Sequence, residues 1–393
     1  MLHATELPEP SPDAVIVSAE LSERIRVAIG DAGGHIGFDD YMRMALYEPG
    51  LGYYLAGAVK FGGQGDFVTA PELSPLFGRC VARQCRQILA RTGGDVVEFG
   101  AGSGLLAASV LTELGECGPL PGRYSIIELS PELRERQRES IRQHAGAHLE
   151  RVEWNSHPPE RPLNGVIIAN EILDALPVKV FKIAGGCVYE RRVRAAKTGF
   201  GWLDVPAGPT LEQTIHHLVP NEIVESNVHY VSEINVGVEP WTADLARMMD
   251  HAVAIVIDYG FPRSEYYHPG RASGTLMCHF RHRKHDDPFW FPGIQDITAS
   301  VDFTGVAEAA DRNGLQVLGF AEQASFLFGC GLLEDAEGSI STLDESARQR
   351  VAYETKVLTL PTEMGTRFKV MALGKRYNEA LRGFQLRDDR HRL

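Results

Sequence analysis

Cysteine is scarce in this chain, and its spacing argues against two common kinds of site. The 393 residues contain six cysteines, and no two of them are separated by only two residues. Closely spaced pairs are typical of structural zinc sites and of thioredoxin-like redox motifs. Scattered cysteines instead predict reduced, mostly buried thiols in a reducing compartment, and no metal site built on them. The six are Cys80, Cys85, Cys117, Cys187, Cys278 and Cys330.

Long apolar runs and an N-terminal sorting signal are also missing. No apolar run approaches the roughly 18 residues that a membrane-spanning helix needs, so we expect no membrane insertion. The N-terminus is rich in proline and carboxylates, with Glu6, Pro8, Glu9 and Pro10, and resembles neither a signal peptide nor an arginine-rich transit peptide. We therefore expect a cytoplasmic location.

Clustered positive charge is rare as well. The formal net charge is -13, from 39 lysines and arginines against 52 aspartates and glutamates. Binding to a nucleic-acid backbone depends on clustered cations that release counterions, so no nucleic-acid partner is expected. The one basic cluster, at 281–285, contains histidines but holds too many cations to attract a divalent metal ion. It predicts a solvated or an acceptor-facing loop.

What the sequence does contain is a strand that leads into a glycine-rich turn. An apolar strand that includes Glu98 is followed by Gly100, Gly102 and Gly104 at alternate positions. Glycines allow the backbone to turn sharply and to lie close to a ligand. The helix expected from Leu105 would direct its free N-H groups at an anion. This arrangement predicts a nucleotide-type cofactor site.

The spacing of the glycines favours S-adenosylmethionine over a dinucleotide. The dinucleotide pattern Gly-x-Gly-x-x-Gly/Ala needs a small sixth residue, whereas Leu105 occupies that position and Gly104 comes one place early. Glu98 would repel a pyrophosphate but attract the ammonium and sulfonium groups of S-adenosylmethionine. An ordinary α/β turn, or a site for another nucleotide, is the alternative interpretation.

A second carboxylate follows where a ribose site requires one. Residues 123–128 form a short apolar run that ends in Glu128, about 20 residues after the glycines, where a carboxylate can accept hydrogen bonds from both ribose hydroxyls. Leu129 is a further candidate contact with the cofactor. Ser130 and Pro131 then start a helix, as N-cap and first helical residue.

Three polar residues follow another apolar strand, at the edge where an open α/β sheet places its ligands. They are Asn170, Glu171 and Asp174. The three-residue spacing predicts that one helical turn aims both carboxylates at one point, where they could bind a guanidinium or act as base for a hydroxyl. These are the predicted catalytic residues. The alternative is that Asn170 caps a helix and Glu171 favours its dipole.

A segment at 65–74 could close over the cofactor, because it combines glycine, carboxylates, hydroxyls and an aromatic ring. Its candidate contacts are Asp66, Phe67, Thr69 and Glu72. The alternative is structural: Asp66 and Thr69 would form side-chain-to-backbone turns, and Glu72 would lie in the first turn of the next helix. Asp258 ends a further apolar strand and is either a site residue or only the end of that strand.

The order of elements predicts an α/β fold with a doubly wound sheet, since strands and helices alternate. One hydrophobic core rarely sustains a chain of this length, so we expect a core with an insertion. Three short alternating strands followed by polar helices mark the insertion. The expected parts are a loose tail at 1–17, helices and a cofactor-covering loop at 18–94, a core at 95–177 and 251–375, an inserted α+β subdomain at 178–250 and a C-terminal tail at 376–393.

These motifs together resemble the MidA-type family of S-adenosylmethionine-dependent methyltransferases, whose mitochondrial members are complex I assembly factors. The resemblance covers about residues 20–375. Departures from the family pattern lie at 229–238 and where the basic cluster leads into 289–291 (Phe-Trp-Phe), and they concern the methyl acceptor more than the cofactor. The matching segments are 47–54, 65–74, 98–104, 128–131, 169–178, 257–260, 274–275 and 296–303.

The resemblance implies a class I methyltransferase-like (Rossmann-like) fold with S-adenosylmethionine as cofactor. For the mitochondrial members it implies symmetric dimethylation of an arginine in a complex I subunit, so we expect a protein acceptor methylated on arginine, with a complex I type subunit as one candidate. The alternatives are a small-molecule O- or N-methyltransferase and a non-catalytic assembly chaperone that binds S-adenosylmethionine. The sequence contains no feature that sets an oligomeric state.

Overall fold

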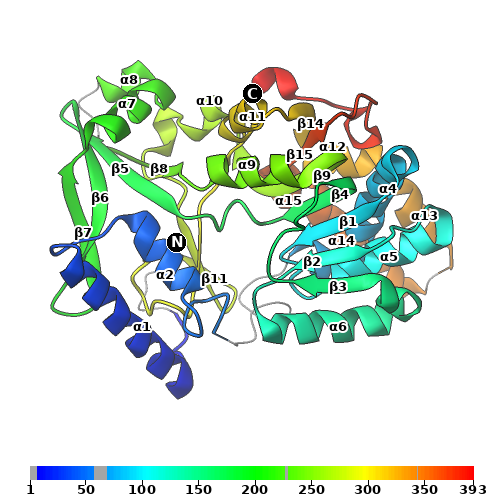
Figure 1. Cartoon of the computed structure of the whole chain (residues 1–393), viewed down its shortest axis with the longest axis horizontal. Helices are drawn as coiled ribbons and strands as arrows, with labels where there is room; N and C mark the ends of the chain where they lie inside the picture. Colours follow the sequence, from blue (N-terminus) through cyan, green and yellow to red (C-terminus); the bar gives the residue numbers. More distant parts are fainter. Residues whose placement is uncertain (1–6, 57–68, 226–228, 343) are drawn as a thin grey trace. The chain divides into compact units, whose positions relative to one another are not determined.

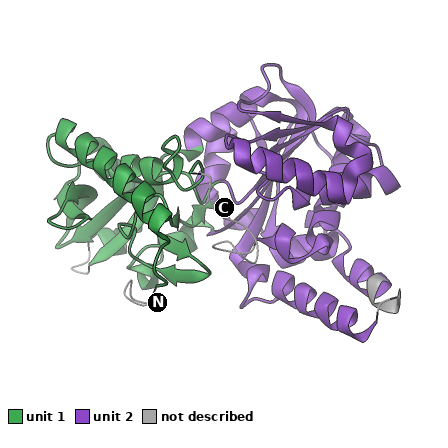
Figure 2. Cartoon of the chain, turned by 90° about the horizontal axis from the view of Figure 1, so that it is seen from below, with its two compact units in different colours: residues 1–67, 173–238, 261–302 green, residues 68–172, 239–260, 303–393 purple. Residues whose placement is uncertain are grey.

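The computed structural model describes residues 7–56, 69–225, 229–342 and 344–393, and the chain divides into two compact units. Unit 1 consists of residues 1–67, 173–238 and 261–302, and unit 2 of residues 68–172, 239–260 and 303–393 (Figure 2). Each unit has its own sheet and its own hydrophobic core.

Unit 2 is built on a mainly parallel sheet, labelled in Figure 1, with the strand order β14-β15-β9-β4-β1-β2-β3. β1 pairs in parallel with β2 on one side and with β4 on the other, so the strand order reverses at β1. Such a reversal opens a crevice at the carboxyl ends of the strands, where α/β proteins bind ligands. The strands are β1 (Asp95–Phe99), β2 (Tyr124–Ile127), β3 (Val152–Asn155), β4 (Leu163–Asn170), β9 (Met249–Phe261), β14 (Gln316–Glu322) and β15 (Phe368–Lys375).

The other strand pairs complete the predicted doubly wound α/β sheet. β2 pairs in parallel with β3, and β4 with β9, whereas β15 is antiparallel to both β9 and β14. The middle of β4 and of β9 is buried on both faces, as expected of valine- and isoleucine-rich strands covered by helices on both sides. The helices are α3 (Ala70–Leu73), α4 (Pro75–Thr92), α5 (Leu105–Cys117), α6 (Pro131–Ala145), α9 (Val238–Met248), α11 (Phe303–Arg312), α12 (Gln323–Gly329), α13 (Leu332–Thr342), α14 (Glu345–Thr359) and α15 (Met364–Arg367), with short 3-10 turns η2 (Gly146–Arg151), η4 (Arg382–Phe384) and η5 (Arg390–Arg392).

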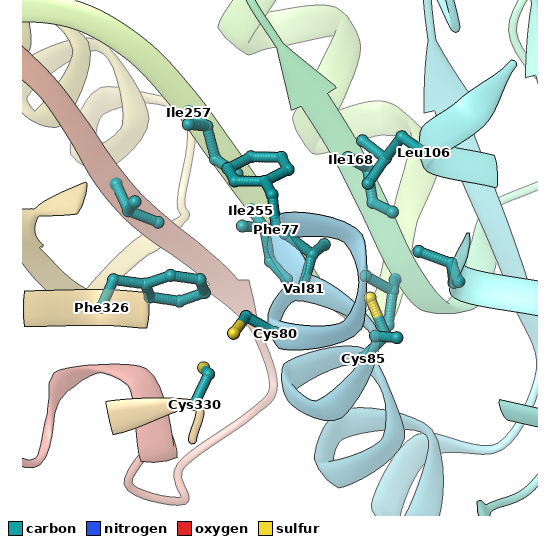
Figure 3. Packing of buried hydrophobic residues seen from close by; sticks show 14 of the residues in the cluster. Phe77, Cys80, Val81, Cys85, Leu106, Ile168, Ile255, Ile257, Phe326 and Cys330 are labelled. Carbon is teal, nitrogen blue, oxygen red and sulfur yellow. The ribbon is translucent and has the colours of Figure 1, made fainter. Parts of the chain in front are cut away.

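The core of unit 2 lies between this sheet and α4. Phe77 and Val81 of α4 face Ile255 and Ile257 of β9 in Figure 3, and all four are fully buried. Burial raises the pKa of the Cys330 thiol to about 12, so this thiol stays protonated and is a poor nucleophile. All six cysteines are free: Cys80, Cys85, Cys278 and Cys330 are buried, and Cys117 and Cys187 are exposed.

Unit 1 contains two antiparallel sheets, of order β7-β6-β5-β8 and β11-β10-β12. Its largest core packs α1 and α2 against β5 and β6. The strands are β5 (Val178–Ala184), β6 (Cys187–Ala195), β7 (Phe200–Pro206), β8 (Tyr230–Asn235), β10 (Met277–Phe280), β11 (Arg283–His285), β12 (Asp296–Thr298) and the two-residue β13 (Val301–Asp302). The helices are α1 (Pro12–Asp31), α2 (Phe38–Tyr47), α7 (Pro209–Leu218), α8 (Asn221–Val224), α10 (Arg263–Tyr266) and the 3-10 turn η3 (Pro269–Arg271).

A loose tail was expected at 1–17, but the described part of that segment includes the start of a helix. α1 begins at Pro12 because Ser11 caps it, its hydroxyl accepting a hydrogen bond from Ala14 N at 3.3 Å. The segment 376–393 is anchored, because Tyr377 and Leu381 are buried in the core of unit 2. The polar helices expected after the third strand of the insertion are interrupted by β8, which pairs with β5. No helix among the described residues is both long and apolar enough to cross a membrane.

Candidate functional site

The glycine loop joins β1 to α5 at the carboxyl edge of the sheet in unit 2. All three glycines have left-handed backbone angles, with φ of 58° at Gly100, 52° at Gly102 and 83° at Gly104. Only glycine adopts such angles without strain, which explains the alternating pattern. Gly104 is also the N-cap of α5 and has no side chain to cap it, so the first N-H groups of α5 are available to an anionic group.

Glu98 precedes this loop, and its carboxylate lies inside the core. It is 2% exposed, and its Oε2 accepts a hydrogen bond from the Tyr124 hydroxyl at 2.7 Å. Burial raises the pKa of the Glu98 carboxyl to about 7, and the Tyr124 hydrogen bond opposes that rise only in part. The contact expected between Glu98 and the ammonium group of the cofactor stays a prediction.

Glu128 lies just beyond the end of β2 and is held in place at both carboxylate oxygens. Its Oε1 accepts from Ser130 N at 2.9 Å, and its Oε2 accepts from Gln137 Nε2 at 3.0 Å. Arg134 of α6 also donates to the Glu128 carbonyl oxygen, from Nε at 2.8 Å. The next residue, Leu129, is 54% exposed and offers an apolar surface beside the carboxylate.

Gln137 links Glu128 to the glycine loop, and it is not among the site residues predicted from the sequence. Its Nε2 donates to Glu128 and, at 3.2 Å, to the Gly102 carbonyl oxygen, while its Oε1 accepts from Trp154 Nε1 at 3.0 Å. Both amide hydrogens and the amide oxygen are therefore used. Gln137 is fully buried and lies one helical turn from each of Leu133 and Ile141. A polar residue on the apolar face of a predicted helix was the signal that could have revealed it.

The free acceptor positions of Glu128 fit a ribose. A carboxylate has about four acceptor positions, two on each oxygen. Ser130 and Gln137 each occupy one, which leaves one position on each oxygen. Two free positions on neighbouring oxygens match the two hydroxyl groups of a ribose. The residues present therefore fit the adenosine part of S-adenosylmethionine.

Asn170 and Glu171 lie at the end of β4, next to β1 in the sheet. Asn170 Nδ2 donates to Glu171 Oε1 at 3.3 Å, and Glu171 N donates to Ile257 O of β9 at 2.8 Å. The buried Asn170 Oδ1 has no hydrogen-bond partner among the described residues. An unused buried acceptor is unfavourable unless a ligand or water reaches it.

The helix expected over residues 171–174 does not exist. Glu171 has a φ of 55°, in the left-handed region, so the chain turns at this residue instead of continuing into a right-handed helix. One helical turn therefore does not aim Glu171 and Asp174 at a common point, and the alternative in which Asn170 caps a helix is also wrong. Glu171 belongs to unit 2 and Asp174 to unit 1.

Asp174 lies in a buried polar cluster of unit 1. It is 5% exposed, and the neighbouring Ala175 carbonyl accepts from the Tyr47 hydroxyl at 3.0 Å. Burial, and then the charges of Asp174 and Asp296, hold the pKa of Tyr47 well above its usual value. Tyr54 stacks on Tyr47 and donates to Asp296 Oδ1 at 2.9 Å. The segments 47–54 and 296–303 thus meet in unit 1.

Of the four candidate cofactor contacts in the segment 65–74, only Thr69 and Glu72 lie among the described residues. Asp66 and Phe67 lie outside the described residues. Thr69 is the N-cap of α3, and its N-H donates to Glu72 Oε2 at 3.5 Å, which is the local role considered as the alternative. α3 contacts α5, the helix that begins after the glycine loop. A contact of Thr69 or Glu72 with the cofactor stays a prediction.

The last candidates are Asp258 and the histidines at and beside the basic cluster. Asp258 is fully buried within β9, which continues to Phe261, so it does not end its strand. His279 and His285 are largely buried, and burial, followed by the charge of Lys284, lowers the pKa of His279 to about 4. The described part of the chain contains no group of three or more His, Cys, Asp or Glu residues that could hold a metal ion.

Comparison with known families supports a cofactor site of this kind. A protein-family model described as "Putative S-adenosyl-L-methionine-dependent methyltransferase" matches residues 77–321, which include the glycine loop, Glu128 and Asn170. The chain is 27% identical to "Protein arginine methyltransferase NDUFAF7, mitochondrial" of Danio rerio, over 87% of this chain and 84% of that protein. It is also 27% identical to "Protein arginine methyltransferase NDUFAF7 homolog, mitochondrial" of Drosophila melanogaster, over 94% of this chain and 88% of that protein.

Solved structures agree over nearly the whole chain. A crystal structure of a Burkholderia thailandensis protein bound to S-adenosyl-homocysteine superposes with a TM-score of 0.92 at 40% identity, covering 99% of this chain and 100% of that one. A second crystal structure from the same organism gives a TM-score of 0.89 at 39% identity, with the same coverage. The predicted class I methyltransferase-like fold is confirmed.

The relatives correct one expectation. A cytoplasmic location was expected from the composition of the N-terminus, but the relatives from Danio rerio and Drosophila melanogaster are both named as mitochondrial proteins. The expectation is therefore wrong. Its physical basis was weak, because a short sorting segment directs a protein to its compartment, whereas the composition and charge of the folded chain do not.

Proposed function

We propose that this chain, which belongs to the S-adenosyl-L-methionine-dependent methyltransferase family, methylates arginine side chains of a protein acceptor. The observation that carries the proposal is the site at the carboxyl edge of the sheet, where the glycine loop follows the central strand β1, Glu128 follows its neighbour β2, and Asn170 and Glu171 lie at the end of its other neighbour β4. The assignment to arginine draws on the relatives, which are named protein arginine methyltransferases and match most of this chain.

The cofactor is S-adenosyl-L-methionine, and residues of unit 2 suit its ribose and its carboxylate. Glu128 has one free acceptor position on each oxygen for the ribose hydroxyls, and exposed Leu129 offers apolar contact. The uncapped N-terminus of α5 suits the carboxylate of the methionine part. S-adenosyl-L-methionine supplies a methyl group on a positively charged sulfur that is already activated for transfer.

Asn170 and Glu171 are the residues proposed to handle the acceptor, and a catalytic role of Asp174 stays a prediction. The Glu171 carboxylate would pair with the guanidinium, and the unused Asn170 Oδ1 would accept one of its N-H groups. Little acid or base strength is needed. These residues would align the nitrogen with the methyl group, exclude water and take up the released proton at a carboxylate. A complex I type subunit as the acceptor is part of the same proposal.

The test is to identify the product. The purified protein is incubated with S-adenosyl-L-methionine carrying an isotopically labelled methyl group and with lysate of cells that lack the protein, and labelled species are identified by mass spectrometry. The Glu128→Ala variant is the matched control. We expect labelled methylarginine in one or a few proteins. Label found only in small molecules, or only on other side chains, would contradict the arginine assignment but leave the cofactor site intact.

A further inference from the structure

The cationic residues of the basic cluster lie at the tip of a hairpin in unit 1. β10 and β11 pair in antiparallel register, with Phe280 opposite Arg283 and His279 opposite Lys284. Only Arg281 and His282 therefore form the turn. All four residues from 281 to 284 are exposed. The tip carries three permanent cations within four residues, in a chain whose formal net charge is -13.

The backbone of this turn is one that glycine and asparagine adopt more readily. Arg281 has a φ of 45° and His282 a φ of 62°. A two-residue hairpin turn with both angles positive favours Asn-Gly or Gly-Gly. The β5–β6 hairpin of the same unit uses Gly185 and Gly186, with φ of 60° and 74°. Left-handed backbone disfavours a residue with a side chain by roughly 1 kcal/mol, so the large side chains of Arg281 and His282 are present here in spite of local backbone preference.

An aromatic base holds the hairpin. Phe280 and Trp290 have ring centroids 4.8 Å apart, and the His285 and Trp290 rings are 5.7 Å apart. Asp287, which follows the cluster, accepts from Phe289 N at 3.0 Å and is thereby used within the base of the hairpin. The basic cluster and the 289–291 segment that follows it, one of the two departures from the family pattern, therefore form one structure, in which aromatic rings pack at the base and cations are exposed at the tip.

We propose that the tip formed by residues 281–284, the basic hairpin, is a docking element for an acidic segment of a partner protein. Arg281 donates a hydrogen bond to the Glu9 carbonyl oxygen at 3.2 Å, and the exposed side chains of Arg283 and Lys284 on β11 are taken as the main contacts for the partner. A peptide is favoured over a nucleic acid because the net negative charge of the chain repels an extended polyanion, whereas a short acidic segment needs only the tip. The inference rests on the proposed function only in taking the partner to be the protein acceptor.

The experiment measures binding of fluorescently labelled oligoglutamate to the full chain by anisotropy, at low and at physiological salt, without cofactor or acceptor. The test variant is Arg283→Glu with Lys284→Glu. The matched control is Arg194→Glu with Lys197→Glu, which reverses one exposed arginine and one exposed lysine at the β6–β7 end of the same unit. We expect the test variant to weaken binding by about tenfold and the control to change it by less than about twofold.

A second variant separates docking from folding. Replacing Arg281 by Asn and His282 by Gly gives the turn its preferred residues and keeps Arg283 and Lys284, so the melting temperature should stay the same or rise and oligoglutamate binding should weaken less than in the test variant. Equal weakening by the test and control pairs, or no change in either, would overturn the proposal. So would tighter binding of oligothymidylate than of oligoglutamate, lost in the same variant. Because no methyl transfer is measured, failure of the proposed function would leave these outcomes unaffected.

Discussion

Gln137 donates a hydrogen bond to the Glu128 carboxylate across 3.0 Å, so a residue of α6 fixes the orientation of a carboxylate beyond the end of β2. Trp154 in turn fixes the orientation of the Gln137 amide, by donating to its oxygen. Burying an amide is unfavourable unless its hydrogen bonds are satisfied, and here they are. The same amide donates to Gly102 O, so one side chain positions both the Glu128 carboxylate and the glycine loop.

Replacing Glu128 by alanine should weaken the binding of S-adenosyl-L-methionine without unfolding the protein. The change removes a charge-assisted acceptor for two hydroxyls, which is worth roughly 1.5 to 3 kcal/mol. Isothermal titration calorimetry measures the loss. Glu132→Ala is the control, since Glu132 is an exposed carboxylate in the first turn of α6, four residues after Glu128. An unchanged dissociation constant in a folded Glu128→Ala variant would remove this residue from the site.

Gln137→Met should weaken cofactor binding while keeping the side-chain volume nearly constant. The variant leaves Glu128 Oε2, Gly102 O and Trp154 Nε1 without the amide, so the carboxylate loses its fixed orientation. We expect an increase of about tenfold in the dissociation constant and a lower melting temperature. Gln137→Glu should bind worse at neutral pH, because it places a second carboxylate beside Glu128, and should recover as the pH falls. Equal affinities for wild type and both variants would show that Gln137 acts on stability alone.

Gly102→Val should abolish most cofactor binding. The φ of 52° at Gly102 is strongly disfavoured for a β-branched residue, and the new side chain would occupy space beside the ligand. A loss of more than about tenfold is expected by calorimetry. Gly146→Val is the control, because Gly146 has right-handed backbone angles and open space around its Cα. Normal binding by Gly102→Val would contradict the assignment of the glycine loop.

Local sequence was sufficient to predict the parallel strands, the glycine loop and the position of Glu128, because each depends on alternation, turn residues and spacing. The bounds of α2 within 18–94 do not follow from the sequence, although Phe38, Tyr41 and Met42 lie on one buried helical face, because aromatic residues and glycines around them favour irregular backbone. β8 was missed because it is defined by pairing with β5, about 50 residues earlier in the chain.

The site was predicted less completely than the sheet. Gln137 acts through Trp154 and Gly102, which come next to it only when α6 packs on the sheet, so no local spacing reveals the network. The prediction of a helix at Glu171 was wrong for another reason. A three-residue spacing of carboxylates favours a helix, but the left-handed φ of 55° at Glu171 ends the regular backbone where β4 ends.

Glu98 should make stability depend on pH between its ordinary and its folded pKa. The folded pKa is raised from 4.5 to about 7, so the folded protein keeps a proton that the unfolded chain releases. The associated stabilisation is fully present below about pH 4.5 and is lost as the pH rises through about 7. Glu98→Gln, which can still accept from Tyr124, should remove this slope and be more stable than wild type at high pH by roughly 2 kcal/mol.

Urea unfolding from about pH 5 to about pH 8 measures that difference, with Glu132→Gln as an exposed control. Parallel profiles for Glu98→Gln and wild type would contradict the raised pKa. Cofactor affinity of the same variant answers the separate question of contact. A large loss of affinity would indicate that the Glu98 charge meets the ammonium group of S-adenosyl-L-methionine, and unchanged affinity would restrict Glu98 to the core.

The last prediction concerns the acceptor residues. Glu171→Gln keeps the shape of the side chain and an oxygen that can accept from Asn170 Nδ2, but deletes the charge. If Glu171 pairs with a guanidinium, cofactor affinity should survive while methyl transfer falls by about 10 to 100 fold. Glu160→Gln, at an exposed carboxylate, is the control. If Glu171 serves only the turn at the end of β4, activity should follow the melting temperature, and Glu171→Gly, which relieves the left-handed angle, should retain transfer.

Asp174→Asn and the double variant Glu171→Gln with Asp174→Asn complete the test. If both carboxylates contact one guanidinium during transfer, their effects on the free energy of activation should not add, whereas independent sites give additive losses. Cofactor affinity, melting temperature and methyl transfer to an arginine-containing acceptor are measured on the same preparations. Full transfer activity in the double variant would exclude a guanidinium-binding role for both residues. It would also favour acceptors that carry no positive charge, because these require no carboxylate for orientation.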